Sequence, residues 1–85
     1  MDLAAIELKA KKSKSLLEDE RFLEVLQDLR KTQFDVFANS SASEVEKRED
    51  ARAILRALTE IERLLNANVD AVTLLAKKGK HRGND

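Results

Sequence analysis

The sequence contains no cysteine and no proline, and both absences limit what the chain can be. Without cysteine there are no disulfides, no thiolate zinc sites and no cysteine nucleophile, and a reducing compartment is compatible with the chain. Because proline is missing and both glycines lie close to the C-terminus, nothing before Lys78 forces the backbone out of a helix. The chain can therefore form long, uninterrupted helices.

Long apolar runs are also missing. No run approaches the roughly 20 residues that span a bilayer, and residues 1–14 lack the continuous apolar core of a signal peptide. We therefore expect a protein that is neither transmembrane nor secreted. The 85 residues make at most one domain, and a chain of this size buries only about 60–65% of its unfolded surface, so its stability is marginal and help from a partner is expected.

The net charge is zero, but the charges are unevenly spread. Residues 1–14 carry four lysines and two acids, residues 77–85 carry four basic residues and one acid, and residues 15–76 carry 8 basic and 13 acidic residues. The basic ends either solvate frayed termini or contact phosphates or an acidic partner surface. The candidate contacts at the C-terminal end are Lys77, Lys78, Lys80 and Arg82.

An apolar repeat at steps of three and four predicts one long helix, at about residues 43–77. It places on one side of that helix the residues Ala51, Ile54, Leu58, Ile61, Leu65, Asn68, Val72 and Leu75. Two overlapping capping boxes mark its start, Ser41 with Glu44 and Ser43 with Glu46. Gly79 is expected to end it as a left-handed cap.

A second helix is predicted at about residues 15–38. Ser15 and Glu18 form a capping box at its start. A mainly apolar stripe follows at four-three spacing, at Phe22, Leu26, Leu29, Gln33 and Val36. Leu16, Leu23 and Phe34 lie about 100° round from that stripe, so this helix is expected to have two neighbours.

The predicted fold is all-α, an antiparallel helical hairpin turning at residues 39–43. Residues 1–14 form a basic, weakly helical segment capped by Asp2, residues 15–78 form the hairpin domain, and residues 79–85 form a flexible basic tail. The seam between the helices is predicted to contain Phe22, Leu26, Leu29, Ile54, Leu58, Ile61 and Leu65.

Asn66 and Asn68 leave two readings of the long helix open. The helix either breaks near these residues, because asparagine is a good N-cap and Asp70 follows, or it continues and Asn68 lies in the seam. A buried polar residue in a seam fixes register and oligomeric state at some cost in stability.

The long helix exceeds its predicted partner by about 15 Å. This overhang is apolar, so either the N-terminal segment folds back over it or another subunit covers it. We favour self-association or docking on a larger protein, because two helices make only half of a four-helix core. The candidate interface comprises Leu23, Phe34, Leu64, Val69, Val72 and Leu75.

Catalytic and metal-binding chemistry is sparse. His81 has no second histidine or cysteine to complete a metal site. Glu46, Glu49 and Asp50 are interleaved with basic residues, which is typical of a solvated helix face. No phosphate-binding glycine loop and no nucleophile with an adjacent base are present. We expect no enzymatic activity, no cofactor and no small-molecule substrate.

Several stretches resemble a class of small helical proteins encoded by tailed bacteriophages and prophages, often among virion-assembly genes. The resemblance covers residues 15–85 and is carried by LEDERFLEVLQDL (17–29), the connector at Asn39, EKREDARAILRAL (46–58) and KGKHRGND (78–85). It implies a phage particle or its assembly as the setting, and localisation to the virion or the bacterial host's cytoplasm. It implies no catalytic residues.

Three functions remain open. The first is an oligomeric virion or assembly accessory component that docks on capsid, portal or an internal virion protein. The second is a small dimeric nucleic-acid-binding regulator that uses its basic ends, although no aromatic side chain is interleaved with them for base stacking. The third is an inhibitor of a host protein, because an acidic helical body also suits mimicry of nucleic acid.

Overall fold

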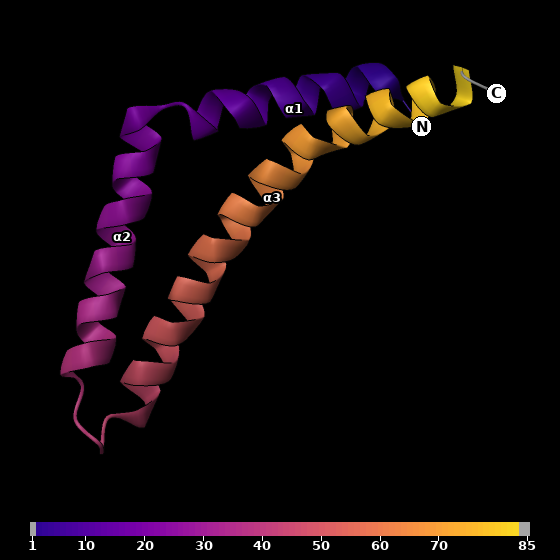
Figure 1. Cartoon of the computed structure of the whole chain (residues 1–85). Coiled ribbons are helices and arrows are strands. Elements are labelled where there is room, and N and C mark those ends of the chain that lie inside the picture. Colours follow the sequence, from indigo (N-terminus) through magenta and orange to yellow (C-terminus); the bar gives the residue numbers. More distant parts are fainter. Residues whose placement is uncertain (1, 84–85) are drawn as a thin grey trace.

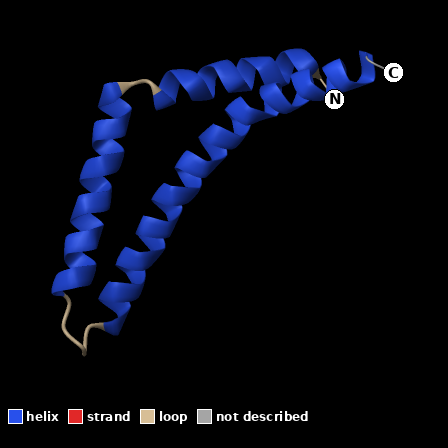
Figure 2. Ribbon diagram, viewed as in Figure 1, coloured by secondary structure: helices blue, strands red, loops and turns tan. Residues whose placement is uncertain are grey.

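A computed structural model describes residues 2–83, with side chains described as far as residue 77. Its three helices are α1 (Leu3–Leu17), α2 (Glu20–Asn39) and α3 (Val45–Gly83) (Figure 1). Two short connections join them, and the described residues contain no strand (Figure 2). The predicted all-α class is therefore confirmed. Within the described part of the chain, no helix combines the length and the apolar character that a membrane crossing requires.

The long helix α3 is the element on which the other two pack. α2 runs beside its first half and α1 beside its second half, so the chain outlines an open angle (Figure 1). The molecule measures 62 × 27 × 18 Å, and its radius of gyration is 18.4 Å. A compact domain of this length has a radius of gyration of about 12 Å. The fold is therefore extended, and much of each helix faces solvent.

The N-terminal segment forms a full helix. As predicted, Asp2 caps it: its Oδ1 accepts hydrogen bonds from the amides of Ala4 (3.0 Å) and Ala5 (3.4 Å). An isolated helix of this length is marginal in water, but α1 buries Ala10 and Ser13 and half-buries residues 6 and 17. Because α1 packs mainly on α3, tertiary burial stabilises a segment that intrinsic propensity leaves weak.

The predicted helix start at Ser15 is wrong. Ser15 lies inside α1, Glu18 is its C-cap, and the N-cap of α2 is Asp19, whose Oδ1 accepts from the amide of Arg21 (2.9 Å). The physical reason lies in packing, because a break at residues 18 and 19 lets both segments contact α3. A capping-box pattern cannot by itself show that the helix upstream of it has ended.

The turn between α2 and α3 is close to its predicted place. Glu44 Oε1 accepts from the amide of Ser41 (2.9 Å), which is one half of a predicted capping box. The Arg48 guanidinium donates to the carbonyls of Ser41 and Ala42 and so closes the turn. The helix then begins at Val45, two residues after the predicted start.

α3 is continuous through the two asparagines, so it does not break near residues 66–68. The Asn66 Nδ2 donates to the carbonyl of Glu62 (2.9 Å), a bond of the kind that bends helices without ending them. Gly79 does not end the helix, because α3 continues to Gly83 and no described glycine has a positive φ. The expected flexible tail, residues 79–85, thus lies partly within α3 and partly outside the described residues.

Candidate interaction surfaces

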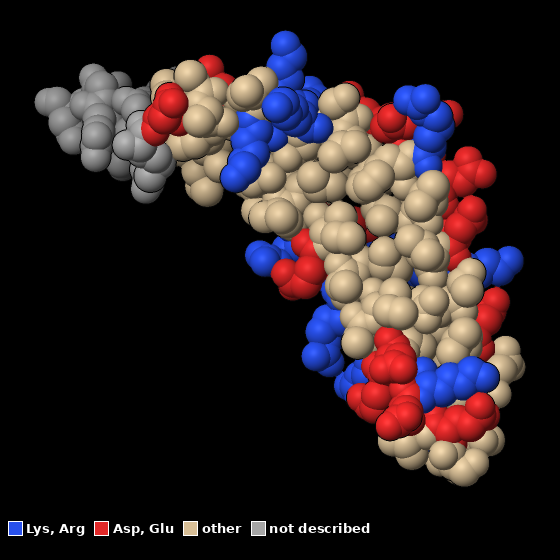
Figure 3. All heavy atoms as spheres, turned by 180° about the vertical axis from the view of Figure 1, so that it is seen from behind, with Lys and Arg blue, Asp and Glu red and all other residues tan. Residues whose placement is uncertain are grey.

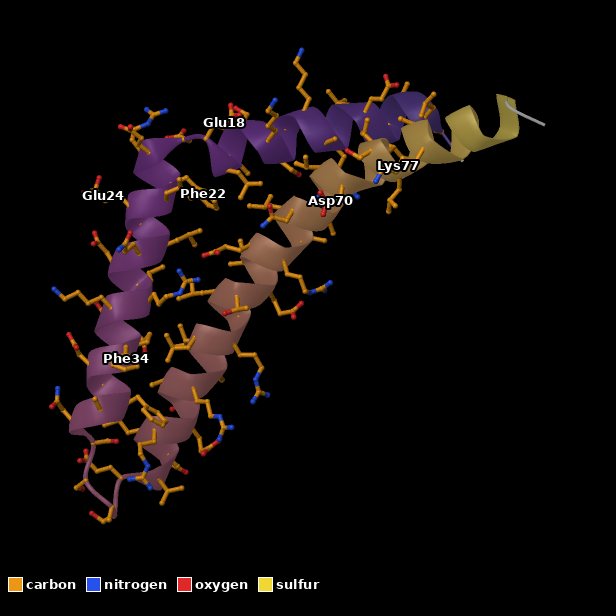
Figure 4. All side chains as sticks on the ribbon, in the orientation of Figure 1. Glu18, Phe22, Glu24, Phe34, Asp70 and Lys77 are labelled. Carbon is orange, nitrogen blue, oxygen red and sulfur yellow. The ribbon has the colours of Figure 1, made fainter. Side chains whose placement is uncertain are left out.

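The seam between α2 and α3 has a register that differs from the predicted one. Leu26, Leu58 and Leu65 are buried as predicted, together with Ala51, and Phe22 is half-buried. Phe22 points into the angle between the helices (Figure 4). The remaining predicted seam residues lie at its margin and are 41–43% exposed: Leu29, Ile54 and Ile61. On the α3 side of this seam, Leu55 and Glu62 are half-buried instead.

The seam contains one ion pair between helices. Arg30 Nη2 donates to Glu62 Oε1 at 2.5 Å, and the two side chains are 40% and 37% exposed. An ion pair this accessible contributes at most about 1 kcal/mol. The sequence contains a signal for this pair, because Arg30 lies four residues after Leu26 and Glu62 lies four residues after Leu58. The pair selects one of two registers that a three-four repeat allows equally well.

A polar contact joins α1 to α3. Asn68 Nδ2 donates to the Ser13 Oγ at 3.0 Å, and Ser13 is the only buried polar residue among those described. Asn68 thus lies in a helix–helix contact, as the continuous reading of α3 predicts, but its partner is α1. Because a displaced Asn68 would leave the buried hydroxyl of Ser13 without this hydrogen-bond partner, the bond favours a single register of α1 on α3.

Three members of the candidate partner interface face α1 in this structure. Val69, Val72 and Leu75 are half-buried, and an open groove of about 330 Å³ between α1 and α3 is lined by Ala10, Val69 and Val72, among others. The N-terminal segment therefore folds back over the overhang of α3, which is the first of the two arrangements considered above. These three residues are less accessible than the rest of the candidate interface.

An uncovered apolar surface lies on one side of the α2–α3 hairpin. We call it the apolar face and define it by Val25 (56% exposed), Leu29, Ile54, Ile61 and Leu64 (57% exposed). At about 100° per residue, the α2 members lie to one side of the seam, and the α3 members lie to the same side because the helices are antiparallel. Uncharged side chains form a continuous band along α2 and α3, with charges at its edges (Figure 3).

The other side of α2 carries a smaller apolar surface with two of the candidate interface residues. Phe34 is 61% exposed and Leu23 is 38% exposed, and Phe37 lies near the same side. Phe34 is the most exposed large apolar side chain among the described residues. It was expected to be either a rim residue of the hairpin or an anchor for another chain, and it has the exposure that an anchor requires.

The two basic segments of the chain both lie along the second half of α3, with Lys11 and Lys14 level with residues 69–73. α1 runs antiparallel to the second half of α3, so its beginning lies beside the end of α3 (Figure 1). Lys77 is exposed at this end of the molecule (Figure 4). Lys78, Lys80 and Arg82 lie on the last turns of α3, and their side chains are outside the described residues. Exposed lysines of α1 add to the positive charge: Lys9, Lys11, Lys12 and Lys14.

The carboxylates whose pKa values are shifted belong to helix caps and surface ion pairs. The amide of Ser41, with help from the ammonium of Lys47, holds the pKa of the Glu44 carboxyl below its ordinary value. The guanidinium of Arg63, 2.8 Å from Glu60, likewise lowers the pKa of Glu60. All four groups are accessible to water. The interactions that lower these pKa values stabilise helix ends and surfaces. They do not form a desolvated acid–base pair.

Within the described residues, no group of three or more His, Cys, Asp or Glu side chains is placed to hold a metal ion. Glu46 and Asp50 line an open depression of about 520 Å³ at the start of α3, and the side chain of His81 is outside the described part. Comparisons with protein-family models, curated proteins and solved structures find no match to this chain. The resemblance to phage proteins accordingly stays a prediction.

Proposed function

We propose that the protein is a non-enzymatic α-helical interaction protein whose working form is an assembly. The observation that carries this proposal is its exposed surface of 7025 Å². A monomeric globular protein of 9.6 kDa exposes about 5,100 Å² by the usual scaling with mass. The excess is about 1,900 Å², which is the area that a chain loses in a large interface.

The kind of surface supports the same proposal. Over the part of the chain whose side chains are described, thirteen large apolar side chains are exposed, whereas five apolar residues are buried. Exposed apolar residues scattered singly need no explanation, but a contiguous apolar surface bordered by polar residues marks an interaction site. The apolar face is contiguous, and so the free chain gains stability when a partner covers it.

We further propose a phage particle or its precursor as the setting, with capsid, portal or an internal virion protein as the partner. The sequence resemblance supports this setting, and Phe34 with Leu23 provides an exposed anchor that α1 and α3 leave free. Mass spectrometry of purified particles from a phage that encodes this chain tests the proposal. We expect the chain in a fixed number of copies per particle, and its absence would contradict the setting.

A matched pair of variants sharpens this test. Phe34→Asp removes an anchor that is 61% exposed, whereas Leu74→Asp alters a leucine of α3 that is 59% exposed and belongs to neither apolar surface. Phe34→Asp is expected to remove the protein from the particle while its helicity stays unchanged. Leu74→Asp is expected to leave incorporation unchanged. Equal incorporation of both variants would refute the role of Phe34.

Nucleic-acid binding is a second candidate, and it is supported by the position of the basic ends. The lysines of α1 and the end of α3 both lie along the second half of α3, so one extended phosphate backbone can contact both. Such binding should weaken steeply between about 50 and 200 mM salt, whereas apolar docking should hardly change. Fluorescence anisotropy with a labelled duplex measures it. Replacing Lys11 and Lys12 by Gln should weaken it, unlike the same change at Lys31 and Lys47 on the hairpin.

A further inference from the structure

We propose that the apolar face binds the same face of a second copy, so that two hairpins form a four-helix bundle with two-fold symmetry. This inference deepens the proposed function, because it names one partner and the surface that binds it. The Leu23 and Phe34 side of α2 stays outside the dimer and remains free for another protein.

The area of exposed surface favours a second copy over a small ligand or a short peptide. The chain exposes about 1,900 Å² more than expected for a monomer of its mass. A standard interface removes only about 800 Å² from each partner, whereas permanent homodimers bury about 2,000–5,000 Å² in total. The excess, which is spread over the whole extended chain, is therefore large enough to include an interface of the permanent class, and the apolar face is the uncharged part of it.

The distribution of charge permits this pairing. In a two-fold dimer the same surface of each copy faces that of the other copy. A charged surface would therefore place like charges opposite each other. Between Ala51 and Leu75, α3 carries six charged residues. Glu62 is paired with Arg30 inside the seam. By helical geometry the others fall outside the sector of the apolar face: Arg52, Arg56, Glu60, Arg63 and Asp70.

The position of α1 leaves the face accessible. α1 packs along the second half of α3, whereas the apolar face lies along the first half and along α2. Leu29 and Ile61 are at its centre, with Leu64 nearer to α1 and Ile54 nearer to the turn. An arrangement that buries the whole face on both copies therefore brings the two Ile61 positions close together.

The absence of cysteine allows a direct test by cross-linking. Ile61→Cys introduces the only thiol into the full-length chain, and Leu74→Cys introduces it on α3 outside the face. With a short bis-maleimide we expect a covalent dimer from Ile61→Cys and mainly monomer from Leu74→Cys. Equal cross-linking of the two variants, or none from Ile61→Cys, would overturn the proposed surface. The result does not depend on a disruptive substitution.

A second pair of variants tests the energetics. Leu64→Glu places a charge in the dimer and should raise the dissociation constant about a hundredfold, whereas Leu74→Glu should not change it. Sedimentation equilibrium measures both, and circular dichroism records helicity. Equal dissociation constants for the two variants would refute the surface. A monomeric wild type that is found in the particle would overturn the dimer and leave the phage setting standing, whereas a dimer that is absent from the particle would overturn the phage setting and leave the dimer standing.

Discussion

The contact between Ser13 and Asn68 gives the sharpest test of how α1 packs on α3. The bond is 3.0 Å long, it joins two neutral groups, and Ser13 is 5% exposed. A neutral hydrogen bond contributes about 0.5–1.5 kcal/mol net, and leaving one buried partner unpaired costs about 1–3 kcal/mol. We therefore expect Asn68→Ala to lower the free energy of unfolding by about 1–3 kcal/mol.

A double-mutant cycle isolates the pair. Ser13→Ala, Asn68→Ala and the double variant are unfolded in urea at one protein concentration, with helicity followed by circular dichroism. The coupling energy should be about 1 kcal/mol, because the second substitution removes a group whose partner is already gone. A domain of 85 residues has a total stability of only about 4–13 kcal/mol, so a loss of this size is measurable.

Asn66 provides the matched control. It lies two residues earlier on the same helix, is exposed, and donates to the carbonyl of Glu62 on its own helix (2.9 Å). Asn66→Ala combined with Ser13→Ala should be additive. If the Ser13–Asn68 pair is additive as well, then α1 does not pack on α3 in the described register and the reasoning is refuted.

Three further predictions concern the core, the seam and the turn. Leu58→Asp buries a charge at a position that is 4% exposed and should cost more than about 4 kcal/mol, abolishing folding or assembly, whereas Leu74→Asp should keep full helicity by circular dichroism. Arg30→Ala and Glu62→Ala should show a coupling below about 1 kcal/mol that decreases with added salt in urea titrations. The pKa of Glu44 is lowered in the folded state, so its stabilisation is complete above its ordinary pKa and is lost as pH falls through the folded value. Glu44→Gln should reduce the acid-side loss of stability, and an unchanged pH profile would contradict the capping role.

The sequence predicted those features of the fold that depend on local chemistry. Asp2 caps α1, and Glu44 binds the Ser41 amide, because both contacts span only two or three residues. The burial of Leu58 and Leu65 follows from their helical spacing. Such features are encoded in short segments, and so they can be recognised without knowledge of the partner helix.

The sequence could not predict the features that depend on tertiary competition. The chain turns at Glu18 and Asp19 because both flanking segments then pack on α3, and no pattern within either segment contains that information. The register of the seam between α2 and α3 likewise depends on tertiary contacts. A three-four repeat allowed either Ile61 or Glu62 to face α2, and the choice depends on residues of the other helix, among them Arg30, which pairs with Glu62.

The most direct test of the account is the mass of the wild-type chain in solution. If the apolar face binds the apolar face of a second copy, sedimentation equilibrium should give twice the chain mass of 9.6 kDa across a wide range of concentrations, with full helicity throughout. A stable, fully helical species that stays at 9.6 kDa over the same range would show that the chain tolerates its exposed apolar surface alone, and would contradict the account.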